Sequence, residues 1–426
     1  MNSASIMIVW ILKDAEPLPL KSGQRALRSG LLAQELGRRG HQVVWWTSTF
    51  SHHLKKFIFE RDTRLELMPN VTLLALDAGR YQRNVSFARL IHHRRLGRRF
   101  RELAGSEPRP DIIVSALPII DFPFQAARYA FSRGVPLIVD VRDPWPDVFA
   151  DKSPAPLRPL VRWLTLNERR RAAYSLKSAV ALTAVSKGFL RWALGLAGRS
   201  QGPHDRVFYL GHSGFEAAGQ ESSHPSKLAV QLNRKLVFTF VGTFGHSYEV
   251  ELIARAAQHF HASRPDVAFV LVGDGHQRAG IEQRYAGLKN LILTGWLDTR
   301  EIAAVLAQSH VGLVPCRSLP DTVPNKPFEY LAAGLPLISS LQGEMAEMIE
   351  THGLGLSYRA GDLGGFIQAV DRIWRDRQAL ALWSANATKA FTEKFSASRI
   401  YPDFASHIEL INELSRRGKT ETAVPG

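Results

Sequence analysis

The chain has 426 residues, of which 45% are hydrophobic and 22% charged, so it can bury the cores of two or three domains and is not an intrinsically disordered protein. Its single cysteine, Cys316, excludes a disulfide framework and indicates a reducing compartment such as the cytoplasm. The net charge of +15 points to an anionic partner, which is a nucleic acid, a membrane surface or an acidic substrate.

The first apolar run, residues 6–12, predicts a buried strand. It is too short to span a membrane, and it lacks the basic flank and cleavage site of a signal peptide. A loop at 17–25, a helix at 26–38 with leucines on one face and a strand at 42–47 follow. The chain therefore opens with the βαβ unit of a nucleotide-binding type of fold.

Residues 80–101 hold eight arginines with apolar side chains between them. This pattern predicts a basic amphipathic helix that favours an anionic bilayer, with Arg94, Arg95, Arg98 and Arg99 toward the lipid. A second basic and apolar stretch, which contains Trp163, extends the expected membrane face. The alternatives are a solvated helix that packs by its apolar stripe, and nucleic-acid binding, for which the chain has no recognised motif.

A strand at 110–115, a helix at 118–131 and a strand at 136–140 continue the α/β pattern. The last strand runs into Val-Arg-Asp-Pro-Trp-Pro-Asp at 141–147, and ligands of open α/β sheets bind where parallel strands end. Arg142 and Asp143 are therefore candidates to orient a sugar or an acceptor hydroxyl. For Asp147 a helix cap or a salt bridge is the alternative to catalysis.

A second domain is expected to begin with a strand at 235–241, after a polar and loose connection at 217–233. Gly242, Thr243 and Gly245 follow that strand, and such small residues let a phosphate or a sugar approach the backbone. The stretch 391–414 predicts a helix that returns to the first domain, and the last dozen residues predict a disordered tail.

The stretch 319–336, Leu-Pro-Asp-Thr-Val-Pro-Asn-Lys-Pro-Phe-Glu-Tyr-Leu-Ala-Ala-Gly-Leu-Pro, lies between two predicted strands. A helix is expected from Pro327 to Ala333, stopped by Gly334. A loop that leaves a strand and enters a helix N-terminus presents free backbone N–H groups to an anion. In this loop Asp321 can grip sugar hydroxyls, Lys326 can neutralise a diphosphate and Glu329 can accept bonds from a ribose; a solvated Lys-Glu pair is the alternative.

This stretch resembles the acidic-x7-Glu signature of family 4 retaining glycosyltransferases, with Asp321 and Glu329 at the two acidic positions and the motif Pro-Asn-Lys-Pro-Phe-Glu-Tyr-Leu at 324–331. The motif at 324–331 and the run at 140–147 are both similar to sequences of one branch of this family, the N-acetyl-L-fucosamine transferases of capsule and O-antigen assembly. Two positions depart from the pattern: Asp321 stands where the family has Glu, and Arg142 stands where it has a His. An Arg and a Lys that many relatives carry after the strand at 235–241 are also missing.

The resemblance implies a GT-B fold, with two Rossmann-like doubly wound domains that face a central cleft. The expected bounds are 1–212 for the acceptor and membrane domain, 213–395 for the donor domain and 396–426 for the crossover helix and tail. The resemblance places these residues at the donor: Gly242, Thr243, Gly245, Gly295, Trp296, Pro324, Asn325, Lys326 and Glu329. It places these at the acceptor or cleft: Ser22, Gly23, Arg25, Trp145 and Asp147. Lys326, with N–H groups of the turn from Gly242 to Gly245, is expected to stabilise the leaving diphosphate.

These observations predict a retaining hexosyltransferase that moves a sugar, expected to be an N-acetylated or deoxy hexose, from a UDP-linked donor to a lipid-linked saccharide. The catalytic candidates are Asp321, Lys326, Asp143 and Arg142. The chain has no Asp-x-Asp, His-Glu-x-x-His or Gly-x4-Gly-Lys-Ser/Thr motif, so no metal and no cofactor are expected. The predicted location is the cytoplasmic face of the plasma membrane. The alternatives are a GT-B-like scaffold without activity and a nucleotide-sugar epimerase.

Overall fold

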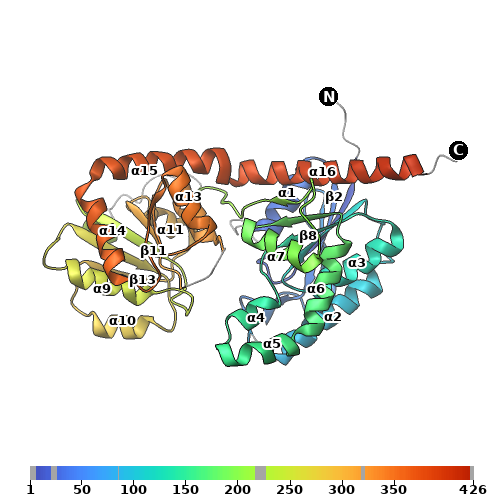
Figure 1. Cartoon of the computed structure of the whole chain (residues 1–426), viewed down its shortest axis with the longest axis horizontal. Coiled ribbons are helices and arrows are strands. Elements are labelled where there is room, and N and C mark those ends of the chain that lie inside the picture. The colour runs from blue at the N-terminus through green and yellow to red at the C-terminus, as the bar shows by residue number, and fades with distance from the viewer. Residues whose placement is uncertain (1–5, 21–25, 85, 216–226, 318–321, 423–426) are drawn as a thin grey trace. The chain divides into compact units, whose positions relative to one another are not determined.

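The structure is a computed structural model that describes residues 6–20, 26–84, 86–215, 227–317 and 322–422 (Figure 1). Its contacts divide the chain into two compact units, residues 1–208 with 401–426, and residues 209–400. Each unit is a parallel sheet covered by helices, as the βαβ pattern predicts.

The first unit contains an eight-stranded sheet in the order β10-β9-β8-β7-β1-β2-β6-β5. Its strands in that order are Arg206–Val207, Ala181–Ala184, Leu137–Val141, Ile112–Leu117, Ile8–Leu12, Gln42–Ser48, Val71–Leu76 and Thr63–Met68. All neighbours are parallel except β5, which pairs antiparallel with β6 at the edge. The chain order reverses between β1 and β7, so a crevice is expected at the carboxyl ends of these two strands.

The helices of the first unit join these strands. They are α1 (Arg28–Arg38), α2 (Phe87–Leu103), α3 (Asp121–Arg133), α4 (Asp147–Asp151), the short 3-10 helix at Ala155–Leu157, α5 (Arg158–Leu164), α6 (Leu166–Ser178) and α7 (Lys187–Ala197). Trp10, Trp45, Trp46 and Phe100 are fully buried among them. A small hairpin, β3 (Phe50–Ser51) with β4 (Lys56–Phe57), follows β2.

The second unit contains a six-stranded, all-parallel sheet in the order β13-β12-β11-β14-β15-β16. The strands in that order are Leu291–Gly295, Val267–Val272, Leu236–Val241, Val311–Val314, Leu337–Ser339 and Gly355–Ser357. The helices are α8 (Lys227–Leu232), α9 (Val250–Phe260), α10 (Arg278–Arg284), α11 (Thr299–Leu306), α12 (Asn325–Ala332), α13 (Glu344–His352), α14 (Leu363–Arg375) and α15 (Arg377–Ala390), then a π-helical turn at Phe391–Phe395. This strand order is that of a dinucleotide-binding fold, and its switch point lies between β11 and β14.

Two sequence-based expectations are corrected by the fold. The connection at 217–233 includes the helix α8, and the predicted tail continues α16 (Ala397–Thr422) as far as Thr422. The stretch 63–76, for which no element was predicted, supplies β5 and β6. The expected return of the last helix to the first domain is confirmed: residues 401–426 belong to the first unit, where Phe404 stacks on Phe208 and Glu409 pairs with Arg39.

Candidate active site

In the second unit, several of the predicted donor residues, Gly242, Lys326 and Glu329 among them, lie at the switch point between β11 and β14. The two strands pair only at Phe238↔Val311 and Thr239↔Gly312, and beyond these pairs they separate. Helix α12 begins at Asn325, just after Pro324, and its first-turn N–H groups are the kind that bind anions. Lys326 and Glu329 lie on this helix, one turn apart.

Lys326 lies above the turn that follows β11. Its Nζ is 4.7 Å from the centroid of the Tyr248 ring and 5.4 Å from that of Phe240, so two aromatic faces stabilise the ammonium. Burial lowers the pKa of Lys326, while the charge of Glu329 opposes that shift. The result is a lysine held in one place rather than a solvated surface charge.

Gly242 provides the space in which Lys326 lies. Its φ is +147°, a region that side chains rarely adopt, and a Cβ at this position would overlap Nζ of Lys326. The Gly242 N–H donates to Val272 O (2.8 Å) and the Phe244 N–H to Asp274 O (2.8 Å). These two amides therefore do not serve the diphosphate, contrary to the expectation for the whole turn, whereas those of Thr243 and Gly245 donate to no described residue.

Tyr330 ties α12 to both strands of the switch point. Its hydroxyl accepts from the Val241 N–H (2.8 Å) and donates to Leu313 O (3.2 Å). The ring lies so close to β14 that a Cβ on Gly312 would overlap it. Tyr330 was outside the predicted site, and the only sequence signal for it is its place directly after Glu329.

The remaining donor candidates differ in their position and in their exposure. Trp296 is 66% exposed and follows Gly295 at the end of β13, the edge strand. Asn325 is exposed and Glu329 is half-buried. Asp321 lies outside the described residues. Cys316 is buried beneath the lysine, and burial raises the pKa of its thiol to about 12, as expected for a core residue.

In the first unit, Arg142 is the centre of a buried ion network. Its guanidinium donates to Asp140 (2.8 Å), Glu16 (2.6 Å) and the Ser29 hydroxyl (2.8 Å). Asp140 also receives two bonds from Arg28. Burial alone would raise the pKa of Asp140, but the charges of Arg28 and Arg142 lower it below its ordinary range. All three nitrogens of Arg142 are engaged, so its visible role is to fix the start of α1 against β8.

Lys13 and Asp14, at the carboxyl end of β1, were not singled out from the sequence. Both are buried, and Asp14 accepts from the Ser48 hydroxyl (2.7 Å) and contacts His92 Nε2 (3.3 Å). Burial lowers the pKa of Lys13 to about 8, with a further contribution from Arg142. The signal available in the sequence was two adjacent charges directly after an apolar strand.

Trp145 lines a cavity of about 190 Å³ in the first unit, and Asp143 is bonded to its indole. The Trp145 indole N–H donates to Asp143 (3.0 Å), and the Arg89 guanidinium lies 4.6 Å from the Trp145 ring centroid. Burial raises the pKa of Asp143, with the Trp145 bond opposing the shift. Leu90 of α2 and Leu164 of α5 also line this cavity.

Asp147 makes structural contacts at the start of α4. It accepts from Arg169 (3.1 Å) and from the Trp192 indole (3.1 Å), as in the alternative of a salt bridge. Ser22, Gly23 and Arg25 lie outside the described residues.

The residues of the predicted membrane face differ in their contacts, since some are paired with carboxylates and others are exposed. Arg94 pairs with Asp121 and Glu168, and Arg99 pairs with Asp62 and Glu102. The stripe of α2 that contains Leu96 and Phe100 is buried, as in the alternative of a packed helix. A group of apolar side chains nearby is nevertheless exposed, here called the apolar patch: Phe87, Leu90, Ile91, Leu160, Trp163 and Leu164. None of the described helices combines the length and apolar content that a membrane span requires.

Two family models match this chain in succession. The "Glycosyl transferase 4-like domain" model covers residues 26–211, and the "Glycosyl transferases group 1" model covers residues 235–376. The chain thus contains a glycosyl transferase 4-like domain followed by a glycosyl transferases group 1 domain, and its fold is GT-B. The predicted fold class is thereby confirmed, while the fucosamine transferase branch is a finer assignment that these models do not make.

Curated relatives are distant. A 2-deoxystreptamine N-acetyl-D-glucosaminyltransferase of Niallia circulans is 24% identical over 42% of this chain and 46% of its own length. A UDP-Gal:alpha-D-GlcNAc-diphosphoundecaprenol alpha-1,3-galactosyltransferase of Escherichia coli is 28% identical over 43% and 47%. The chain thus spans about half the length of the curated relatives it matches.

The fold is also that of Anabaena HepE, whose crystal structure was determined in complex with UDP. That structure aligns with a TM-score of 0.63 at 13% identity, covering 95% of this chain and 100% of HepE.

Proposed function

We propose that this glycosyltransferase transfers a hexosyl unit from a UDP-sugar to a lipid-linked saccharide, with retention of configuration and without a metal. The observation that carries the proposal is Lys326, held above Gly242 at the switch point with Glu329 one helical turn away. This is the position at which an open parallel sheet binds a nucleotide. HepE, which shares the fold, was crystallised with UDP.

On this proposal each donor residue has a distinct task. Lys326 and the amides of the α12 first turn neutralise the diphosphate as it leaves. Such stabilisation of developing charge by fixed groups is expected to be the largest contribution to the rate enhancement. Glu329 accepts bonds from the ribose hydroxyls. The exposed Trp296 offers an aromatic face to the base. Asp321 remains a candidate contact for the donor sugar.

We assign the acceptor to the cavity lined by Trp145, whose indole N–H is bonded to Asp143. The indole face suits a sugar ring, and a carboxyl whose pKa is raised by burial is suited to orient an acceptor hydroxyl. Leu90 and Leu164 of the apolar patch also line this cavity and are exposed, and such apolar side chains suit the lipid of a lipid-linked acceptor. The Escherichia coli relative is named for a diphosphoundecaprenol-linked substrate, which is the same kind of molecule. We place the patch on the anionic inner surface of the plasma membrane.

A thermal-shift panel of UDP, GDP, ADP and dTDP tests the nucleotide site. A ligand that binds only the folded state raises the melting temperature by mass action. We expect a UDP-specific rise that is lost in Glu329→Ala and kept in Glu350→Ala, a matched change on α13 of the same unit. Absence of a shift with every nucleotide would contradict the proposal and favour the scaffold alternative.

Lys326→Ala tests the role of the lysine in the reaction. We expect turnover to fall by roughly two to three orders of magnitude, the range found when a donor to a developing anion is removed. The melting temperature should change little, because the deletion also relieves a partly buried charge. Turnover and melting temperature are measured on the same preparation, and unchanged turnover refutes the role.

A further inference from the structure

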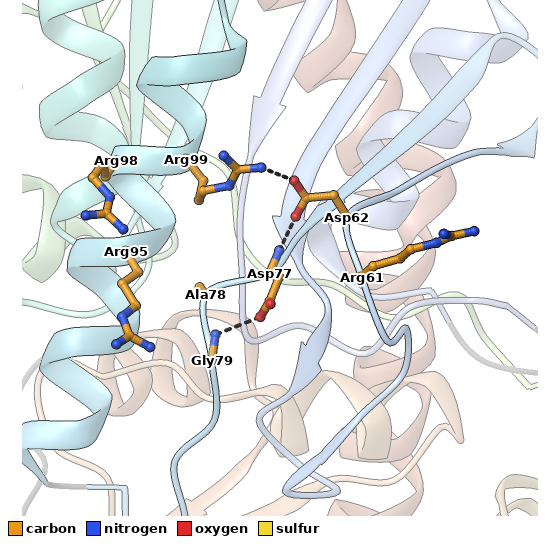
Figure 2. Close-up of a pocket in the computed structure, with 8 residues that line it drawn as sticks. All are labelled: Arg61, Asp62, Asp77, Ala78, Gly79, Arg95, Arg98 and Arg99. Atoms are coloured by element: carbon orange, nitrogen blue, oxygen red, sulfur yellow. Dashed lines mark hydrogen bonds and ion pairs between the residues drawn. The ribbon is translucent and has the colours of Figure 1, made fainter.

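A second cavity of the first unit, of about 540 Å³, is lined by none of the residues assigned to the donor or the acceptor (Figure 2). One wall is α2, which contributes Arg95, Arg98 and Arg99 from one face of the helix. The opposite wall is the segment from Asp77 to Gly79 after β6, together with Arg61 and Asp62 before β5. Four arginines and two aspartates therefore line one concave space.

The two carboxylates of this cavity are already bonded within the protein. Asp62 accepts from the Asp77 N–H (2.6 Å) and pairs with Arg99, and Asp77 accepts from the Gly79 N–H (2.9 Å). Figure 2 shows these contacts along the wall opposite α2. They hold the wall in shape, and neither aspartate makes an ion pair with Arg95 or Arg98 among the described residues, so the four arginines outnumber the two carboxylates in this space.

Arg95 and Arg98 supply the available positive charge. Arg95 is exposed and makes no ion pair with any described residue. Arg98 has only a long contact of 3.6 Å with Glu102, and its side chain is 60% exposed. In Figure 2 both side chains lie on the α2 side of the cavity, whereas Arg61 extends away from them.

Gly79 brings the opposite wall close to Arg95. A Cβ at this residue would lie 3.0 Å from Arg95 Nη1, and its φ of +82° favours glycine. The Gly79 carbonyl contacts His92 Nδ1 (2.8 Å), and His92 in turn contacts Asp14. The cavity is thus joined to the polar cluster at the carboxyl end of β1, the edge at which such sheets bind ligands.

We propose that this cavity binds a phosphate group through Arg95 and Arg98. Two guanidinium groups on one helix face match phosphate oxygens, each able to donate two bonds in a fixed geometry. A volume of about 540 Å³ accommodates a diphosphate or a phosphosugar. Only the source of the phosphate rests on the proposed function: a lipid-linked acceptor contains a diphosphate. An anionic lipid headgroup would present the same phosphate chemistry.

The test compares two double variants in a Lys326→Ala background, which removes the other proposed phosphate contact. Arg95→Gln with Arg98→Gln changes the cavity. Arg101→Gln with Arg128→Gln removes the same charge from exposed positions on α2 and α3 that do not line it. Binding of inorganic pyrophosphate is measured by calorimetry, and binding to vesicles of phosphatidylcholine with and without phosphatidylglycerol by sedimentation.

We expect the cavity variant to bind pyrophosphate at least about ten-fold more weakly, as for the loss of hydrogen bonds to a charged group, and the control to bind normally. A selective loss of binding to phosphatidylglycerol vesicles alone would support the site with a lipid headgroup as the carrier. Equal losses in both variants, or none in either assay, would overturn the proposal.

The UDP thermal shift, measured with Lys326 intact, separates this inference from the proposed function. We expect Arg95→Gln with Arg98→Gln to leave that shift unchanged. A protein with no UDP shift but with selective pyrophosphate binding would retain the second site and lose the proposed function. The reverse result would remove only the second site.

Discussion

Lys326 and Gly242 depend on each other, because the lysine amine occupies the space that a side chain at residue 242 would fill. Neither residue type is unusual by itself. Their relation arises from the fold, which brings the start of α12 over the end of β11. At the scale of single residues, the candidate donor site therefore combines a glycine that leaves room for the lysine amine with a lysine that supplies the positive charge.

Gly242→Ala should displace Lys326 and abolish the UDP thermal shift. Gly287→Ala is the matched control, since Gly287 also has a positive φ (+85°), but a methyl group there would meet no atom within 4 Å. Both changes should cost about 1–2 kcal/mol of unfolding free energy from backbone strain. If both variants bound UDP normally, the proposed packing of Lys326 on Gly242 would be wrong for donor binding.

His93 should make the first unit sensitive to acid. Burial lowers the pKa of His93 to about 3, with contributions from Arg89 and His92, so the folded protein holds it neutral. Between pH 6.5 and 3 the unfolded state binds more protons, and stability therefore falls as the pH falls. The loss at pH 5 relative to pH 7 is about 2 kcal/mol from this residue.

The acid sensitivity is checked by denaturant unfolding at pH 7 and pH 5. His93→Gln, which keeps an acceptor for Arg89 (3.4 Å in the native protein), should reduce the pH dependence, whereas the exposed His259→Gln should not. The same pH dependence in wild type and His93→Gln would show that His93 does not contribute.

Helix α12 is the element on which the donor site depends. Its apolar residues Phe328 and Leu331 are buried in the core, while Lys326 and Glu329 face the other way and are half-buried. The Tyr330 hydroxyl fixes the helix to β11 and β14 where these strands separate. The position of two site residues is thus set by one buried hydroxyl.

Tyr330→Phe should lower the unfolding free energy of the second unit by about 1–3 kcal/mol, because the buried Val241 N–H loses its acceptor. UDP affinity should fall as well, since α12 loses its anchor. Tyr285→Phe serves as the control, because its hydroxyl makes only a 3.4 Å contact with Glu251. Equal unfolding free energies of Tyr330→Phe and wild type would show that the bridge does not hold the helix.

At the scale of the whole molecule, net charge and exposed apolar area act together. The chain carries +15, and the first unit exposes the apolar patch, in which Trp163 is 70% exposed and Phe87 86%. Either feature alone gives weak attachment to a bilayer, whereas charge and apolar burial together give a stable one. The ion pairs of Arg94 and Arg99 mean that the patch, rather than those two arginines, is the part expected to enter the lipid.

Trp163→Ser should weaken binding to vesicles that contain phosphatidylglycerol by roughly ten-fold, as expected for the loss of a large buried apolar side chain. Phe131→Ser is the control, because Phe131 is 86% exposed on α3 and lies outside the patch. Binding should also weaken at high salt, which screens the charge attraction. Equal effects of the two substitutions would argue against a defined membrane face.

The sequence by itself determined the two α/β domains and the position of the donor loop, because apolar runs, glycines and prolines report local structure directly. The bounds of α12 were predicted to within two residues at its start and one at its end for this reason. Lys326, Glu329 and Trp145 were predicted from segments that follow strand ends, where ligands bind in such sheets, and from the family resemblance of those segments.

Only the tertiary structure decided which charges remain available. The three nitrogens of Arg142 each donate one bond, to Asp140, Glu16 and Ser29, of which the last two lie far away in the sequence. The same holds for the arginines of α2, of which Arg94 and Arg99 are paired, whereas Arg95 has no ion pair among the described residues. A charged residue looks the same in a sequence whether or not it has a partner, because the partner comes from another part of the chain.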